Sequence, residues 1–347
     1  MTDITQRKDE HLDIVLKRDV APIWATTGFE RMSFEHVALP ELSLSDIDLS
    51  TTFLGRAVSV PLMVSSMTGG PSRAEAVNAA IADAARSLGL AFGVGSQRVA
   101  LETENLAGLG SNLRRRAGPV PILANLGAAQ LREADGVDHV RRAVDMIDAD
   151  GIIIHLNPLQ EAVQFGGDTD WRGVLSAIET LCSAEVRPVI AKEVGGGIAG
   201  PVAKALKDAG VSVIDVAGSG GTSWAAVEAE RAQDEKARAV ASAFRDWGIP
   251  TAQAIVDVRK ACPQTPIIAS GGIRNGIDAA KAIRLGATLV GQAGGVLQSA
   301  VHGSKALIDN LSISIEQLKV VCFCTGSADL SDLRKARAVA SDPNWLA

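Results

Sequence analysis

The chain has no tyrosine, and its few Phe and Trp residues bring the aromatic fraction to only 3% of 347 residues. Aliphatic side chains therefore dominate the 47% of residues that are hydrophobic. A core built from Ala, Val, Ile and Leu is typical of parallel strands buried on both faces beneath helices, and it disfavours an antiparallel sandwich. This composition, with 21% charged residues, excludes a mainly disordered or low-complexity chain.

Cysteine is also scarce. Cys182, Cys262, Cys322 and Cys324 form no pair of CxxC units, and four cysteines in a chain of this length do not make a disulfide framework. We expect reduced thiols in apolar surroundings.

A positive net charge and long apolar runs are missing as well. The 34 Lys and Arg residues are outnumbered by 40 Asp and Glu, which gives a net charge of −6 and no broad positive field for nucleic acid or anionic membranes. No apolar run reaches the ~18 residues that span a bilayer, and the polar start does not resemble a signal peptide. We expect a cytoplasmic protein that acts on a small molecule.

Short apolar runs followed by Gly-rich or polar turns and Ala-rich helical stretches recur along the middle of the chain. This rhythm predicts repeated strand–helix units. Eight such units favour a closed (β/α)8 TIM barrel over an open sheet. The eight runs begin at Pro61, Leu90, Pro121, Gly151, Pro188, Val211, Pro266 and Ala287.

Three further segments flank or interrupt the predicted barrel, which spans residues 61–325. Residues 1–60 form an N-terminal extension with a short helix over RKDEHLDIVLKRD and then irregular or short-strand chain. A charged insertion at 219–249, after strand six, is far longer than a usual connection and is a candidate lid. Residues 326–347 form a C-terminal tail in which we expect a helix over LSDLRKARAV and a frayed end at SDPNWLA.

The strongest local signal lies after strands seven and eight, in SGGIRNG (270–276) and GQAGG (291–295). Barrels frequently bind phosphate at these two strand ends, because glycines let backbone N–H groups approach the anion and helix N-termini add positive potential. The alternative is a pair of plain tight turns. We expect a single phosphate cradle that fits FMN rather than FAD or NAD, made by Gly271, Gly272, Ile273, Arg274, Ala293 and Gly294.

Other strand ends carry polar side chains that suit a flavin. Lys192 ends strand five, where its ammonium would stabilise the negative charge of a reduced flavin, although a lysine can also extend to solvent. Several more strand-end residues are suited to the flavin ring and its amide-like edge, or else cap turns. They are Ser66, Met67, Thr68, Ser96 and Asn125.

Strand four ends in a polar cluster, HLNPLQE (155–161). His155 and Asn157 are two apart and share a face, and Gln160 and Glu161 follow. One carboxylate among amides suggests partial coordination of Mg²⁺, with substrate phosphate and water completing the shell. The alternative for Glu161 is a carboxylate stabilised by a helix N-terminus.

Three cations could supply a local field for a diphosphate at the mouth of this acidic protein: Arg7, Lys8 and Arg98. The first two could equally form a solvated helix face. We take the remaining histidines as structural or surface residues: His11, His36, His139 and His302.

At these residues the sequence closely resembles the type 2, FMN-dependent isopentenyl diphosphate isomerases. The motifs occur in the family's order over nearly the whole chain, and RKDEH together with HLNPLQE is the most specific combination. The shared motifs are RKDEH at 7, SMTGG at 66, GVGSQR at 93, ANLGA at 124, HLNPLQE at 155, KEVGGG at 192, AGSGGTSWA at 217, SGGIRNG at 270 and GQAGG at 291.

The resemblance implies roles for individual residues. It places Arg7, Lys8, Arg98, His155, Asn157 and Gln160 at the substrate, with Gln160 and His155 as the catalytic side chains, and Mg²⁺ at Glu161. Trp224 and Glu228 resemble lid residues that the family brings over the substrate. FMN is held in the family by residues matching Ser66, Met67, Thr68, Ser96, Asn125, Lys192, Thr222, Gly272, Ile273, Arg274, Ala293 and Gly294.

The implied reaction is a reversible 1,3-allylic proton shift between isopentenyl and dimethylallyl diphosphate, with reduced FMN as acid and base and NADPH as the priming reductant. The resemblance also suggests a homotetramer or larger assembly. Rival interpretations are weak: a 2-hydroxy acid oxidase needs a His–Arg pair after a late strand, and a dehydrogenase resembling inosine monophosphate dehydrogenase needs a cysteine in a mouth loop. A non-catalytic phosphate-binding barrel remains as the alternative from a different class.

Overall fold

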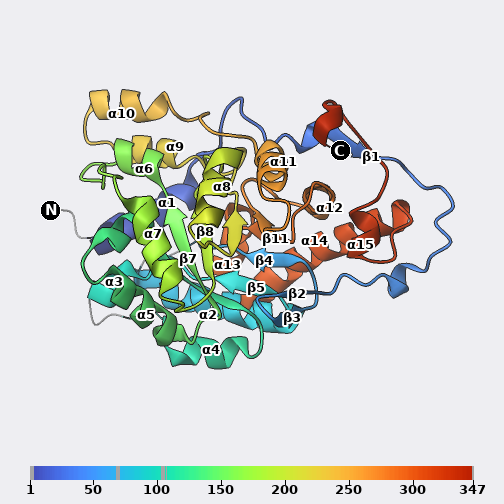
Figure 1. Cartoon of the computed structure of the whole chain (residues 1–347), viewed down its shortest axis with the longest axis horizontal. Coiled ribbons are helices and arrows are strands. Elements are labelled where there is room, and N and C mark those ends of the chain that lie inside the picture. Colours follow the sequence, from blue (N-terminus) through green and yellow to red (C-terminus); the bar gives the residue numbers. More distant parts are fainter. Residues whose placement is uncertain (1–3, 68–70, 103–105, 107, 346–347) are drawn as a thin grey trace.

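A closed barrel of eight parallel strands forms the centre of the molecule (Figure 1). The computed structural model describes residues 4–67, 71–102, 106 and 108–345. Each of the eight predicted apolar runs forms one barrel strand, so the predicted fold class is confirmed. The strands are β4 (Leu62–Val64), β5 (Ala91–Gly93), β6 (Ile122–Gly127), β7 (Gly151–Leu156), β8 (Val189–Glu193), β9 (Val213–Asp215), β10 (Ile267–Ala269) and β11 (Leu289–Gln292).

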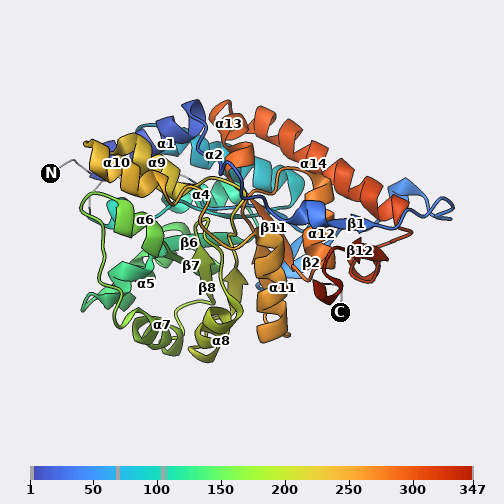
Figure 2. The same cartoon turned by 90° about the horizontal axis from the view of Figure 1, so that it is seen from above.

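A helix follows every strand and covers the outside of the barrel (Figure 2). Alanine-rich faces let these helices lie close to the aliphatic strands, and most of their alanines are fully buried. The covering helices are α2 (Pro71–Leu88), α4 (Ser111–Ala117), α5 (Gly136–Ile147), α7 (Val174–Ser183), α8 (Gly200–Asp208), α11 (Thr251–Ala261), α12 (Gly276–Arg284) and α14 (Ser304–Cys324).

Shorter helices lie between some strands and their covering helices. These are α3 (Arg98–Glu102), α6 (Pro158–Val163), α9 (Trp224–Arg231), α10 (Glu235–Ser242) and α13 (Gly294–Val301). The insertion proposed as a lid thus folds into α9 and α10. Together with the N-terminal helix α1 (Ile4–Lys17), these two helices lie side by side at one edge of the molecule (Figure 2).

The two ends of the chain meet in a small sheet that local sequence patterns did not predict. Strand β1 (Met32–Phe34) pairs with β12 (Ala338–Ala340), so the expected helix over LSDLRKARAV is wrong beyond α15 (Leu330–Leu333). The expected fraying of SDPNWLA is wrong for Trp345, which is 4% exposed and donates a hydrogen bond from Nε1 to Gln253 Oε1 at 3.0 Å.

The lower lumen of the barrel is filled by one aliphatic layer. A hairpin of β2 (Thr51–Phe53) and β3 (Arg56–Val58) adds Phe53 and Val58 to this cluster. Such a packed layer makes the barrel interior a core rather than a channel. Each strand contributes one residue: Met63, Ala91, Leu123, Ile153, Ile190, Val213, Ile268 and Leu289.

The cysteines are free, as predicted, and Cys262 and Cys322 are buried. Within the part of the chain that the structure describes, there is no helix with both the length and the apolar character needed to cross a membrane.

Phe53→Ala should lower the free energy of unfolding by about 3–5 kcal/mol, because it leaves a cavity against the lumen layer. Denaturant unfolding measures this change. Leu39→Ala is the control, since Leu39 is 76% exposed and surface substitutions change stability by about 0.5 kcal/mol or less. Similar losses in the two variants would contradict the role given to the hairpin.

Candidate active site

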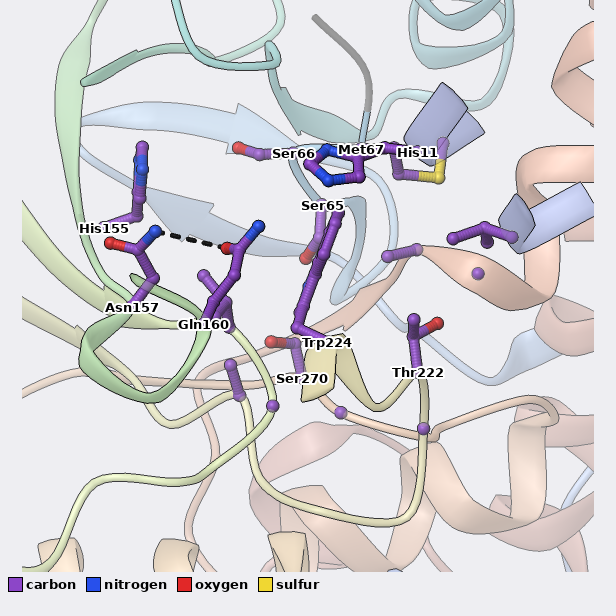
Figure 3. A pocket seen from close by; sticks show the side chains of 18 of the residues that line it. His11, Ser65, Ser66, Met67, His155, Asn157, Gln160, Thr222, Trp224 and Ser270 are labelled. Carbon is purple, nitrogen blue, oxygen red and sulfur yellow. Dashed lines mark hydrogen bonds between the residues drawn. The ribbon is translucent and has the colours of Figure 1, made fainter. Parts of the chain in front are cut away.

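A cavity of about 510 Å³ opens where the strands end (Figure 3). Its walls come from α1, from the loops after all eight barrel strands and from the first turns of α6, α9 and α13. Side chains from distant parts of the chain, such as His11, Ser65, His155 and Trp224, converge on it (Figure 3). This is the end of the barrel at which active sites are found.

The floor of the cavity follows from the alternation of strand residues. Successive side chains of a strand point to opposite faces, so the residues two positions beyond the aliphatic lumen layer also face inward. Unlike the layer below, this upper layer is polar or lacks side chains. Its members are Ser65, Gly93, Asn125, His155, Lys192, Asp215, Ser270 and Gly291.

The orientation of His155 is fixed by its neighbour on β6. Asn125 Nδ2 donates to the Val94 carbonyl at 3.0 Å, so its Oδ1 faces His155 Nδ1 at 2.9 Å and accepts a hydrogen bond from it. Burial, with the nearby charges of Lys192 and Lys8, lowers the pKa of His155 to about 3. The imidazole is therefore neutral at pH 7, with the proton on Nδ1 and an acceptor at Nε2.

Helix α1 brings cations to the cavity. Lys8 Nζ donates to the Ser96 carbonyl at 3.0 Å, which ties the helix to the loop after β5. Burial and the nearby charges of Arg7 and Arg98 lower the pKa of Lys8 to about 8. Three cations gathered in this way favour an anionic ligand that would relieve their mutual repulsion.

The start of α6 presents amides and one carboxylate. Asn157 Nδ2 donates to Glu161 Oε1 at 2.9 Å and to Gln160 Oε1 at 3.2 Å (Figure 3 draws the second bond). Glu161 Oε2 accepts from the Asp168 backbone N–H at 2.8 Å and from Gln164 Nε2 at 3.2 Å. These bonds fix the direction of the Glu161 carboxylate, whose oxygens keep further lone pairs for a ligand.

Glycines form the part of the cavity wall that follows β10. Gly271 and Gly272 have φ of 104° and 72°, and a Cβ on either would overlap the backbone carbonyl of Gly218 or Gly220 in the preceding loop. Helix α13 begins beside them at Gly294, and its N-cap, Ala293, provides no side-chain cap. Its first N–H groups therefore have no side-chain acceptor, as expected of a helix end that can bind an anion.

Behind the cavity wall lies a buried carboxylate. Glu228 is 3% exposed and does not line the cavity, contrary to its expected position at the substrate. It accepts hydrogen bonds from His11 Nε2 at 2.8 Å, Arg231 Nη1 at 2.7 Å and Gln160 Nε2 at 3.2 Å. The His11 ring also meets Trp224 edge-on, at 5.2 Å between centroids. Glu228 thus links α1, α6 and α9 around the cavity.

Comparison with known proteins decides the family. The chain is 59% identical over 335 residues to an isopentenyl-diphosphate delta-isomerase from Cronobacter sakazakii, with 96% of each chain covered. It is 60% identical over 334 residues to one from Stutzerimonas stutzeri, again with 96% of each covered. The chain belongs to the isopentenyl-diphosphate delta-isomerase family.

Two wider comparisons place this isomerase family member among flavin-dependent barrels. Residues 157–340 match the family model of FMN-dependent dehydrogenases. Solved structures with the same fold include mandelate oxidase with (S)-2-phenylpropionate, at a TM-score of 0.66 and 18% identity over 95% of this chain and 94% of that one. A lactate oxidase from Pediococcus acidilactici has a TM-score of 0.67 and 16% identity, over 95% and 87%.

The structure gathers nearly all the predicted site residues around this one cavity. Thr68 lies outside the described residues, and Glu228 lies behind the wall. The remaining ones line the cavity: Arg7, Lys8, Ser66, Met67, Ser96, Arg98, Asn125, His155, Asn157, Gln160, Glu161, Lys192, Thr222, Trp224, Gly271, Gly272, Ile273, Arg274, Ala293 and Gly294.

Sequence reasoning missed several lining residues. His11, expected to be structural or a surface residue, also lines the cavity, four positions from Arg7 on one helix face. Gln164 follows Glu161 at the helical spacing of three, so this signal was available. Ser65 and Ser270 belong to the inward-facing layer, which strand alternation could have identified.

The rival interpretations lack their required residues here. The loop after β9, from Ala217 to Thr222, contains neither His nor Arg. The four cysteines lie on α7, just after α11 and on α14, so none ends a barrel strand.

The signals of His155 in an NMR pH titration should not move between about pH 5 and 8, since its pKa is lowered well below the ordinary value of about 6.5. Because the unfolded chain takes up this proton first, the same group should reduce stability as the pH falls from about 6.5 towards 3. His155→Gln assigns the signals. A midpoint above about pH 6 would contradict the neutral imidazole.

Proposed function

We propose that this protein interconverts isopentenyl diphosphate and dimethylallyl diphosphate by a 1,3-allylic proton shift, with FMN, Mg²⁺ and NADPH as priming reductant. The observation that carries the proposal is a single cavity whose lining includes two groups suited to anions. One group is the glycine loops and the start of α13, whose N-cap has no side-chain cap, and the other is Arg7, Lys8 and Arg98. A flavin mononucleotide and a diphosphate substrate together require such a division.

The residues present fit FMN. Among the residues that the structure describes, the buried Ser66 hydroxyl has no hydrogen-bond partner, which suits a polar ligand group at this wall. A Cβ at Gly295 would lie 3.7 Å from Arg274 Cγ, so the start of α13 packs directly against the loop after β10. Gly272, Ile273, Arg274, Ala293 and Gly294 would hold the phosphate, and Met67, Ser96, Asn125, Thr222 and Lys192 would surround the ring.

FMN in its reduced form supplies a proton donor and acceptor at N5 and an electron-rich ring that stabilises a cationic transition state. The protein positions the substrate against it. Arg7, Lys8 and Arg98 bind the diphosphate, while His155, Asn157 and Gln160 fix the chain that carries the alkene. A cavity of this kind must be dry, because water would quench a carbocation.

Two features of the chain serve that exclusion of water. Trp224 on α9 presents its ring to the cavity, and the contact of His11 with Trp224 packs α1 against it (Figure 3).

The bond from Gln160 to Glu228 holds the Gln160 amide, so its carbonyl oxygen remains oriented toward Asn157. In this account Gln160 and His155 contact the reacting part of the substrate, and Glu228 orients Gln160.

Further parts of the proposal concern the protein in the cell. The cytoplasmic location expected from the sequence stays a prediction. The homotetramer or larger assembly implied by the family resemblance also stays a prediction, and the exposed rings of Trp24 and Trp247, 84% and 65% accessible, are candidates for its interfaces because aromatic residues are enriched there.

The activity is tested by incubating the protein anaerobically with FMN, Mg²⁺, NADPH and isopentenyl diphosphate. We expect dimethylallyl diphosphate in large molar excess over the NADPH consumed, because no net redox occurs. FMN binding without product would favour the non-catalytic phosphate-binding barrel. Reduction of the bound flavin by an added 2-hydroxy acid, which becomes the 2-oxo acid, would favour an oxidoreductase.

Glu161→Gln should raise the Mg²⁺ concentration needed for half-maximal rate at least tenfold, since it removes the only charge that we assign to the metal. FMN binding should be unchanged. The matched control is Glu179→Gln, an exposed carboxylate on α7 far from the cavity wall. Rate curves with an unchanged midpoint and a lower maximum would reassign Glu161 from metal ligand to an acid–base role.

A further inference from the structure

Asp215 is a buried carboxylate that lies near the cavity but has no contact with solvent. It ends β9 within the inward-facing polar layer, is 0% exposed and does not line the cavity. Ser270 Oγ donates to its Oδ1 at 2.6 Å. Its Oδ2 has no hydrogen-bond partner in the described part of the chain. A buried carboxylate with one unsatisfied oxygen is costly unless a nearby charge compensates it.

The neighbouring strand supplies that charge. Lys192 on β8 is in register with Asp215, and both belong to the same inward layer. Lys192 is 8% exposed, and its Nζ donates to the Glu193 carbonyl at 2.7 Å. Burial raises the pKa of Asp215, and the charge of Lys192 acts against this rise. Lys192 lines the cavity, whereas Asp215 in the same inward layer does not.

The other carboxylate next to Lys192 in the described part of the chain is already engaged. Glu193 turns back on its own loop, where Oε2 accepts from the backbone N–H groups of Val194 and Gly195 at 2.6 Å each, and from that of Gly196. Two more titratable groups line this cavity: His155 on β7, which is neutral and lies near the charge of Lys192, and Lys8 on α1, a cation whose charge also acts on His155. Asp215 is the one acidic member of the inward layer.

We propose that Asp215 is a positioning residue, the ionised counter-charge that keeps Lys192 protonated at the cavity floor, where the proposed function places the flavin ring. The inference rests on that function and goes beyond it. Without Asp215, the inward layer would hold no carboxylate to balance Lys192, in a cavity that Arg7, Lys8 and Arg98 also line. Burial and neighbouring cations favour the neutral form of an amine.

The test compares the affinities of the protein for oxidised and reduced FMN, measured anaerobically by ultrafiltration between about pH 6 and 9. Asp215→Asn keeps the size and can still accept from Ser270, but it removes the charge. For each protein, the affinity for reduced FMN is divided by the affinity for oxidised FMN. As the pH rises, we expect this ratio to fall at least tenfold further in Asp215→Asn than in wild type. A tenfold change corresponds to about 30 mV in the two-electron potential of the bound flavin.

Asp215→Asn combined with Lys192→Met is the matched control, because it lacks the lysine that would titrate. The additional fall should vanish in this double variant. Ser270→Ala, which loses the hydrogen bond and retains the carboxylate, should follow wild type. The inference is overturned if Asp215→Asn parallels wild type at every pH, or if its additional fall persists without Lys192.

A folding defect does not remove the test. If Asp215→Asn unfolds because it strands a buried cation, adding Lys192→Met should recover stability in a double-mutant cycle. Failure to recover would show that Asp215 acts through Ser270 alone and would overturn the inference. A wild-type protein that binds no FMN would refute the proposed function itself, which is a separate outcome.

Discussion

Every second residue of a barrel strand points into the lumen, and this alternation decides which side chains form the floor of the site. One inward layer is wholly aliphatic, from Met63 on β4 to Leu289 on β11. The layer two residues further along is polar or glycine, and it forms the cavity floor. A rigid apolar layer beneath a polar one fixes Asn125, His155 and Lys192 without mobile loops, which is the arrangement that pre-organised electrostatics requires.

Charge is separated across this floor and its rim. His155 stays neutral because it is buried near cations, whereas Arg7, Lys8 and Arg98 line the same cavity. The glycine loops and the start of α13 add backbone N–H groups and Arg274 to the lining. An anion with two phosphates and an anion with one phosphate can therefore bind together without competing for the same donors.

The sequence predicted the barrel strands because fully buried parallel strands are continuous apolar runs. It also predicted most cavity residues, since strand ends meet at one face of the barrel. The pairing of β1 with β12 was beyond such reasoning, because the partners lie some 300 residues apart and no local pattern encodes the contact. Asp215 was missed because it lies inside the apolar run VSVIDVAG, and the position of Glu228 depends on how α9 packs against α1 and α6.

The central claim is that one cavity holds two anionic groups on two different sets of residues. A crystal structure of the protein with FMN and inorganic diphosphate tests it most directly. We expect the FMN phosphate at Gly271–Arg274 and the start of α13, the ring over Lys192 and Asn125, and the diphosphate beside Arg7, Lys8 and Arg98. An FMN phosphate bound by Arg7 and Lys8, or a diphosphate that displaces FMN from the glycine loops, would contradict the account.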